Sequence, residues 1–122
     1  MKRCLFVDDS SVIRKVAKRI LNGPELSVVE ASTGAEGLDM CNYDMPDIIV
    51  VDGALEDIST VDFIRRVRAI HGRVKPQIVI CLTEVDIGAI MRAKRAGAQG
   101  YLLKPFNRPQ LLDRFRAFDI AA

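Results

Sequence analysis

The amino-acid sequence predicts an α/β protein in which helices cover both faces of a single parallel sheet. Short apolar runs alternate along the chain with longer segments whose apolar residues recur at helical spacing. Most of the short runs are apolar at every position, as expected of parallel strands that are buried on both faces. Charged side chains directly follow several of these runs, which indicates a polar site at one edge of the sheet.

Five strands are expected along the chain. The third carries the strongest signal, because it is a run of β-branched residues that follows Pro46 and ends at Asp52. The predicted strands are Cys4–Val7, Leu26–Ala31, Ile48–Val51, Ile78–Leu82 and Tyr101–Leu103. Each is followed by a segment of helical period, so neighbouring strands are expected to be parallel.

The first predicted helix is capped by Ser10 or Ser11 and stops at residues 22–24, which read Asn-Gly-Pro. Its buried face is expected to consist of Val12, Ile13, Val16, Ala17, Ile20 and Leu21. The second helix is predicted from about Thr33 to Asn42. Both helices lie between predicted strands and would therefore pack on the sheet.

Three further helices follow. Ser59 and Asp62 stand three residues apart, which resembles a capping box at the start of the third helix. The fourth helix is predicted over Val85–Ala96 and ends at Gly97. Asn107 opens the last helix, whose inward residues are expected to be Leu111, Leu112, Phe115 and Phe118.

The composition is that of a globular protein of one domain. The chain has 122 residues, of which 49% are hydrophobic and 28% are charged. No apolar run approaches the roughly 20 residues of a membrane helix, and the run after Met1 is too short for a signal peptide. We therefore expect a monomeric, cytoplasmic protein with one domain over residues 1–122. Its formal charge of +2 gives no indication of DNA binding.

The cysteines and the histidine exclude several kinds of site. Cys4, Cys41 and Cys81 are widely spaced in apolar stretches and form no C-x-x-C pair, so buried free thiols are expected. His71 is the single histidine and lies in a glycine-containing loop. A zinc site, a disulfide framework and a Ser/His/Asp triad are therefore not predicted.

The polar residues that follow the predicted strands belong to one edge of the sheet. Asp8 and Asp9 follow the first strand, Asp52 the third, Thr83 the fourth and Lys104 the fifth. The carboxyl ends of parallel strands meet at one edge, where such folds bind ligands. Carboxylates there repel each other, by about 4 kcal/mol for a pair ~4 Å apart at an effective dielectric constant of ~20. A hard cation such as Mg²⁺ would relieve this repulsion.

With its charge neutralised, Asp52 is a candidate nucleophile toward phosphorus. Aspartate side chains form aspartyl phosphates in covalent catalysis. The cation and Lys104 would shield the charge of the incoming phosphoryl group, and the hydroxyl of Thr83 could hydrogen-bond to it. The residues therefore predict a magnesium-dependent phosphoryl acceptor.

Three segments resemble the receiver domain of bacterial two-component response regulators. They are Phe6–Ser10, Ile49–Asp52 and Ala96–Phe106. The resemblance covers the whole chain, and Cys4–Leu21 is most similar to stand-alone regulators of the chemotaxis (CheY-like) type, which have no output domain. It implies a flavodoxin-like, three-layer α/β/α fold with a five-stranded sheet in the order 2-1-3-4-5.

The resemblance implies a role for each acidic residue. Asp52 would accept a phosphoryl group from a histidine kinase. Asp9 would bind Mg²⁺ directly and Asp8 mainly through water, while the backbone carbonyl of Ala54 would complete the protein ligands. The domain would be no enzyme beyond this transfer to its own Asp52 and the subsequent autodephosphorylation.

It also implies how the signal leaves the site. Lys104 would contact the phosphoryl group and precede a cis bond to Pro105. Tyr101 would be the aromatic residue whose side-chain conformation follows phosphorylation. The altered surface would act on a downstream protein, such as the flagellar motor in chemotaxis or motility.

The segment after Asp52 departs from the family pattern. The family usually has a Met-Pro-x-Met-Asp-Gly-like loop, whereas residues 53–60 here read Gly-Ala-Leu-Glu-Asp-Ile-Ser-Thr. Glu56 and Asp57 add negative charge at the mouth of the site. We expect this charge to alter the lifetime of the phosphoryl group or the fit of the kinase.

The second departure concerns the switch hydroxyl, the side-chain hydroxyl that couples phosphorylation to the aromatic residue. In the family it usually lies one place further from the Lys-Pro pair than Thr83 does, and that place holds Leu82 here. Two arrangements stay open. A local shift brings Thr83 into the site, or the coupling between a hydroxyl and Tyr101 is weakened.

Other functions fit the residues less well. A haloacid-dehalogenase-type phosphatase needs a second acid two residues after its nucleophile, where this chain has Ala54. A flavodoxin or dinucleotide binder needs a phosphate-binding loop after the first strand, where Asp8 and Asp9 would repel phosphate. Two roles within the family remain open, a phosphate sink and an adaptor that binds cyclic di-GMP. The cations available to such an adaptor are Arg92, Lys94, Arg95, Arg108, Arg114 and Arg116.

Overall fold

The computed structural model describes residues 1–117 and has the predicted three-layer, flavodoxin-like architecture. The strands are β1 (Lys2–Val7), β2 (Leu26–Ala31), β3 (Ile48–Asp52), β4 (Gln77–Leu82) and β5 (Gly100–Leu103). The helices are α1 (Ser11–Leu21), α2 (Gly34–Tyr43), α3 (Thr60–Ala69), α4 (Ile87–Ala96) and α5 (Arg108–Arg116). All strand pairs are parallel and their order is β2-β1-β3-β4-β5, so the predicted order is confirmed. Within this part of the chain, no helix combines the length and the apolarity of a membrane span.

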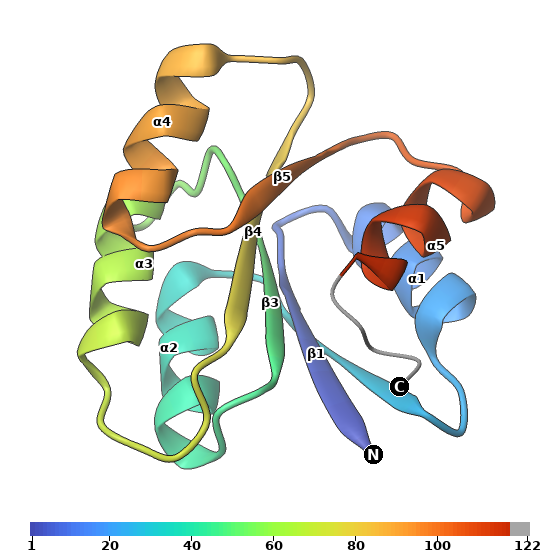
Figure 1. Cartoon of the computed structure of the whole chain (residues 1–122), viewed down its shortest axis with the longest axis horizontal. Coiled ribbons are helices and arrows are strands. Elements are labelled where there is room, and N and C mark those ends of the chain that lie inside the picture. Colours follow the sequence, from blue (N-terminus) through green and yellow to red (C-terminus); the bar gives the residue numbers. More distant parts are fainter. Residues whose placement is uncertain (118–122) are drawn as a thin grey trace.

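Helices cover both faces of the sheet, with α2, α3 and α4 on one face and α1 and α5 on the other (Figure 1). Alternate residues of a strand point to opposite faces, so β1 contributes to two cores. On the α1 and α5 side, Phe6 stacks on Phe115 with ring centroids 6.4 Å apart and also contacts Phe106. On the other side, Val7 packs with the fully buried Phe63. The continuous apolar character of β1 therefore reflects burial on both faces.

Val12 does not lie on the buried face of α1 as predicted. Its exposed fraction is 68%, whereas Ala17 and Leu21 are buried. Successive residues are rotated by roughly 100° about a helix axis, which places Val12 beyond the edge of the apolar stripe that begins at Ile13. The remaining predicted residues of this face are buried or packed against the core.

Helix α4 begins two residues later than predicted. The carboxylate of Asp86 accepts a hydrogen bond of 3.0 Å from the backbone N–H of Ala89 and thereby caps the helix at Ile87. Val85 is consequently outside the helix, and Val85 and Ile87 are 53% and 67% exposed. The apolar side chains at this end of the helix therefore lie on the surface and not in the core.

The other helix starts are capped largely as expected. The hydroxyl of Ser59 accepts a 3.1 Å hydrogen bond from the N–H of Asp62. The reciprocal bonds of a capping box are present at Asn107 and Gln110, at 3.0 and 2.9 Å. Phe118, predicted to point inward from α5, lies outside the described residues.

The cysteines are free and buried, as predicted. Burial raises the pKa of the Cys4 thiol well above its ordinary value. Burial likewise raises the pKa of Cys41 to about 11 and that of Cys81 to about 12. These thiols therefore remain protonated and serve as apolar side chains of the core.

Candidate functional site

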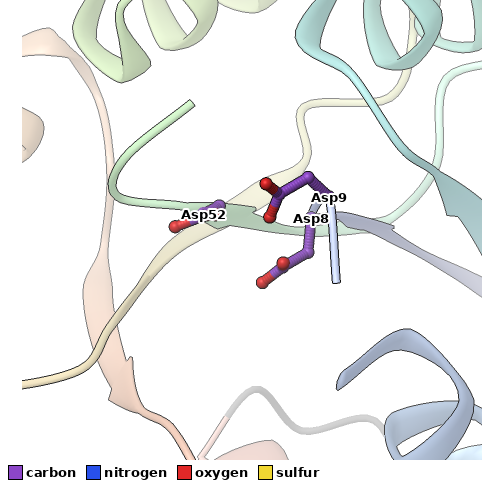
Figure 2. Close-up of side chains that lie close together, drawn as sticks. All are labelled: Asp8, Asp9 and Asp52. Atoms are coloured by element: carbon purple, nitrogen blue, oxygen red, sulfur yellow. The ribbon is translucent and has the colours of Figure 1, made fainter. Parts of the chain in front are cut away.

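Strands β1 and β3 bring three carboxylates together at the carboxyl edge of the sheet (Figure 2). Val7 pairs with Val51, so Asp8 and Asp52 follow at the same level of neighbouring strands. Oxygens of Asp8, Asp9 and Asp52 all lie within 4.8 Å of one another. Asp8 and Asp52 are only 2% and 7% exposed, whereas Asp9 is exposed. The structure thus gathers the three acids that the sequence assigns to one edge.

Lys104 is the cation of this cluster. Its Nζ lies 2.7 Å from Oδ2 of Asp8 and 3.3 Å from Oδ1 of Asp52. Burial by itself would lower the pKa of Lys104, but the hydrogen bond with Asp8 and the charges of Asp52 and Asp8 outweigh burial and raise it. Lys104 is therefore held in its charged form. The peptide bond to Pro105 is cis, as the resemblance implies.

Asp8 is held in place by its neighbours on several sides. Its Oδ1 accepts a 2.8 Å hydrogen bond from the N–H of Ser10, and its own N–H donates to the carbonyl of Ala31. The guanidinium of Arg14 donates to the Asp8 carbonyl and also, through Nε, to Glu30 at 3.1 Å. Sequence reasoning missed Arg14 and Glu30, because nothing in the sequence links a polar residue of α1 to one of β2.

Asp52 is fixed by the loop that follows it. Its Oδ1 accepts a 3.0 Å hydrogen bond from the backbone N–H of Ala54. The hydroxyl of Thr60 donates to the Asp52 carbonyl at 2.8 Å, which ties the start of α3 to the end of β3. The N–H of Gly53 donates to the carbonyl of Cys81 on β4. Asp52 is therefore anchored to α3 and, through Gly53, to β4.

A cleft of about 330 Å³ opens beside the acidic cluster. Its walls are formed by Asp9, Ser32, Thr33, Asp52, Ala54, Leu55, Glu56 and Asp57. The carboxylate of Asp57 accepts hydrogen bonds from the N–H groups of Ala35 and Gly34 at 2.9 and 3.0 Å, and these bonds lower its pKa. Glu56 and Asp57 thus both line the mouth, and Asp57 also caps α2.

Leu82 occupies the place at which the family has its switch hydroxyl. It is the last residue of β4, pairs with Leu103, and packs against the core beneath α3 and α4. A Cβ atom added at Gly53 would lie 2.4 Å from Cδ2 of Leu82. A side chain at position 53 would therefore collide with Leu82, which explains why the residue after Asp52 is glycine.

Thr83 follows β4 and is exposed. Together with Tyr101 and Lys104 it lines a second cleft, of about 590 Å³, between β5 and α5. The ring of Tyr101 carries the guanidinium of Arg114 at 5.3 Å from its centre, within the range of a cation–π interaction. The structure thus places Thr83 and Tyr101 in the same cleft, and the role of Thr83 in switching stays a prediction.

The acidic cluster fits a hard divalent cation. It offers only oxygen ligands, and its three carboxylates face a single lysine, so its charge is negative. Mg²⁺ prefers one or two carboxylates and retains several waters, which suits a cluster with one exposed member, Asp9. When bound, it would shield the negative charge of a phosphoryl group arriving at Asp52.

Comparisons with known proteins place the chain among signalling proteins. The response regulator receiver domain matches residues 4–116. The chain belongs to this family. It is 27% identical over 113 residues to the chemotaxis protein CheY of Thermotoga maritima, with 92% of each chain covered. It is 34% identical over 115 residues to the response regulator MprA of Mycobacterium tuberculosis, but it spans about half the length of that relative, 49%.

Solved receiver structures agree with the fold. A putative response regulator from Chloroflexus aurantiacus superposes with a TM-score of 0.85 at 30% identity, covering 99% of this chain and 98% of its own. The chemotaxis protein CheY4 of Vibrio cholerae gives a TM-score of 0.83 at 26% identity, with 96% and 98% covered. Receiver domains are signalling domains and not metabolic enzymes, and they typically bind Mg²⁺ in an acidic pocket.

Proposed function

We propose that this receiver domain accepts a phosphoryl group on Asp52 from a histidine kinase. The observation that carries the proposal is the convergence of Asp8, Asp9 and Asp52 within 4.8 Å, with Lys104 paired to two of them. Mg²⁺ would be held by Asp9, Asp52 and the backbone carbonyl of Ala54, and by Asp8 mainly through water. A structural role alone would not require three acids at one edge, because their mutual repulsion opposes folding.

The transfer follows from the contacts of Asp52. Its Oδ1 is held by the N–H of Ala54 and lies near Lys104, so Oδ2 is the oxygen placed to attack phosphorus. A bond forms between this oxygen and phosphorus while the bond from phosphorus to the kinase histidine breaks. Lys104 is close enough to exchange Asp8 for an oxygen of the phosphoryl group, which stabilises the added charge. Hydrolysis of the acyl phosphate later restores Asp52 and releases phosphate.

The pathway that we propose is chemotaxis or motility, in the cytoplasm, with a downstream protein such as the flagellar motor as target. It is supported by the likeness to CheY of Thermotoga maritima over nearly the whole length of both chains. The signal would leave through the surface formed by α4, β5 and α5, since Tyr101 lies in β5 and Lys104 directly follows it. A phosphate sink would need the same acceptor chemistry without this surface change.

Phosphate incorporation tests the acceptor directly. The protein is incubated with acetyl phosphate and Mg²⁺, and its mass is followed. Asp52→Asn should abolish the gain of a phosphoryl group, whereas Asp39→Asn, which alters an exposed acid of α2, should leave it unchanged. Incorporation that persists in Asp52→Asn would overturn the assignment. If the assignment holds, phosphotransfer from each of the cell's histidine kinases to the intact protein would identify the phosphodonor.

A further inference from the structure

Helices α3 and α4 and the start of β4 carry a concentration of positive charge. Residues 60–77 and 87–96 hold eight of the 18 Lys and Arg residues but only one of the 16 Asp and Glu residues. Their formal charge is therefore +7, and that of the rest of the chain is −5. We name this region the α3–α4 basic face. Its cations are Arg65, Arg66, Arg68, Arg73, Lys75, Arg92, Lys94 and Arg95.

The two helices lie side by side (Figure 1), and Arg68 joins them. Its guanidinium donates to the carbonyl of Gly97, directly after α4, at 2.7 and 3.1 Å, and also to Gln99. Gly97 has a φ of 124°, and a Cβ atom there would lie 2.9 Å from Nε of Arg68. Arg68 is therefore a structural residue that fixes the spacing of the two helices.

Most of the remaining cations are exposed. Arg65 lies 3.8 Å from Asp62. Within residues 1–117, six cations of the face make no ion pair and no side-chain hydrogen bond, and these are Arg66, Arg73, Lys75, Arg92, Lys94 and Arg95. Like charges that are gathered without counter-charges create a positive potential, which attracts an acidic ligand.

A groove of about 320 Å³ lies in this face, between the end of α3 and the start of β4. Its walls are formed by Val67, Arg68, Ile70, His71, Gly72, Val74, Lys75 and Pro76. Val74 is 38% exposed, so apolar surface is open to solvent beside the cations. A ligand that fits must therefore combine negative charge with an aliphatic group.

We propose that the α3–α4 basic face docks an acidic segment of a partner protein, which places an aliphatic side chain in the groove. A nucleic acid fits less well, because the single aromatic residue of these segments, Phe63, is buried and offers no stacking surface. A membrane surface fits less well too, since Val74 is the one large hydrophobic side chain exposed at the groove, whereas the other two of the face, Ile87 and Met91, lie on α4. Charge complementarity and the mixed groove favour a peptide.

The groove lies at the opposite end of the sheet from the acidic cluster. It precedes β4, whose first residue, Gln77, pairs with Ile48 at the start of β3, whereas Asp52 ends that strand. Docking there leaves the phosphoryl site open, so a partner could remain bound in both states of the domain. The proposal is independent of phosphorylation, and Asp52→Asn should bind the partner as tightly as the intact protein.

Fluorescence anisotropy with a labelled synthetic peptide tests the proposal. The probe carries a central leucine flanked by glutamates and is titrated with the full chain at low ionic strength. Arg73→Glu combined with Lys75→Glu should weaken binding by about tenfold or more, because both charges border the groove. Lys18→Glu combined with Arg19→Glu makes the same change of charge on the exposed side of α1 and should alter binding less than about twofold.

Two further binding measurements identify the class of ligand that the groove takes. Replacing the leucine of the peptide by serine should weaken binding several-fold if the groove takes an aliphatic side chain. A labelled DNA duplex and vesicles of phosphatidylglycerol are titrated in parallel. Absence of peptide binding, equal losses in the two charge-reversal variants, or tighter binding of the duplex or the vesicles than of the peptide would each overturn the proposal.

Discussion

The carboxyl edge of the sheet has two halves that differ in packing. At the ends of β1 and β3, Asp8 and Asp52 are almost fully buried, and both pair with Lys104, which directly follows β5. Asp8 also bonds to Ala31 of β2, and Gly53, next to Asp52, bonds to Cys81 of β4. Beyond the end of β4, Thr83 and Val85 are exposed, and so is Ile87, the first residue of α4. The half that would carry out the chemistry is therefore rigidly positioned, whereas the half that would report it has fewer packing constraints.

The two halves meet where Leu82 covers Gly53. This contact is apolar, so it transmits changes of shape more readily than changes of hydrogen bonding. A receiver with a hydroxyl at this place could bond to the phosphoryl group directly. Here a movement of the loop after Asp52 would instead press on Leu82.

The largest difference between the halves is expected in stability. Phe6→Ala should lower the free energy of unfolding by about 3–5 kcal/mol, since Phe6 is fully buried against two other aromatic rings. Ile87→Ala should change it by less than about 0.5 kcal/mol, because Ile87 is exposed. Urea denaturation measures both values, and similar losses would contradict the division into two halves.

Magnesium should stabilise the β1 and β3 half selectively. At a concentration about 100 times its dissociation constant, a ligand that binds only the folded state adds about 2.7 kcal/mol to the free energy of unfolding. Asp9→Ala should remove most of the corresponding rise in Tm, and Asp8→Ala should remove part of it. Amide shifts in a magnesium titration should centre on residues 8, 9, 52 and 53, and their absence there would rule out the metal site.

The boundary between the halves can be tested at Gly53. Gly53→Ala should destabilise the protein by about 1–3 kcal/mol, because the added methyl group overlaps with Leu82 and lies 3.2 Å from the carbonyl of Cys81. In Gly53→Ala combined with Leu82→Ala, the loss should be smaller than the sum of the single losses. Additive losses would show that the two residues do not meet.

A smaller effect is expected at Thr83. Beryllofluoride, a phosphoryl mimic, should shift amides of α4 and β5 in the intact protein. Thr83→Ala should leave most of these shifts in place, because Leu82 and not Thr83 lies against Gly53. Loss of the shift at Tyr101 would instead show that Thr83 enters the site. Shifts confined to the acidic cluster in both proteins would favour a phosphate sink.

The smallest effect concerns Glu30, which supports Asp8 through Arg14. A hydrogen bond from Lys15, together with a weaker effect of the bond from Arg14, lowers the pKa of Glu30 below its ordinary value of 4.5. Burial acts in the opposite direction but is outweighed. The folded state is therefore stabilised when the pH is above the ordinary pKa of Glu30. This stabilisation is lost as the pH falls through the lower pKa that Glu30 has in the folded state. Glu30→Gln should therefore be less stable than the intact protein near neutral pH, and the difference should vanish in acid. A constant difference across that range, measured by denaturation, would contradict this.

The sequence predicts the fold well because its strongest signals are local. The apolar run Ile48–Val51 identifies a strand buried on both faces, and parallel strands bring Asp8 and Asp52 to one edge by geometry alone. Contacts between distant polar residues have no such signal. The bond from Arg14 to Glu30 joins residues 16 positions apart. The bonds by which Asp57 caps α2 join residues 22 and 23 positions apart. From the sequence alone, Arg14 and Asp57 could equally have faced solvent.

Cys4, Cys41 and Cys81 lie in β1, α2 and β4, and each thiol is buried. An alkylating reagent attacks the thiolate, and both burial and the raised pKa values suppress that form in the folded chain. Modification must therefore wait until the surrounding segment opens. Each thiol therefore reports the opening of the element that carries it, and the three rates of alkylation together would give the order in which β1, β4 and α2 open.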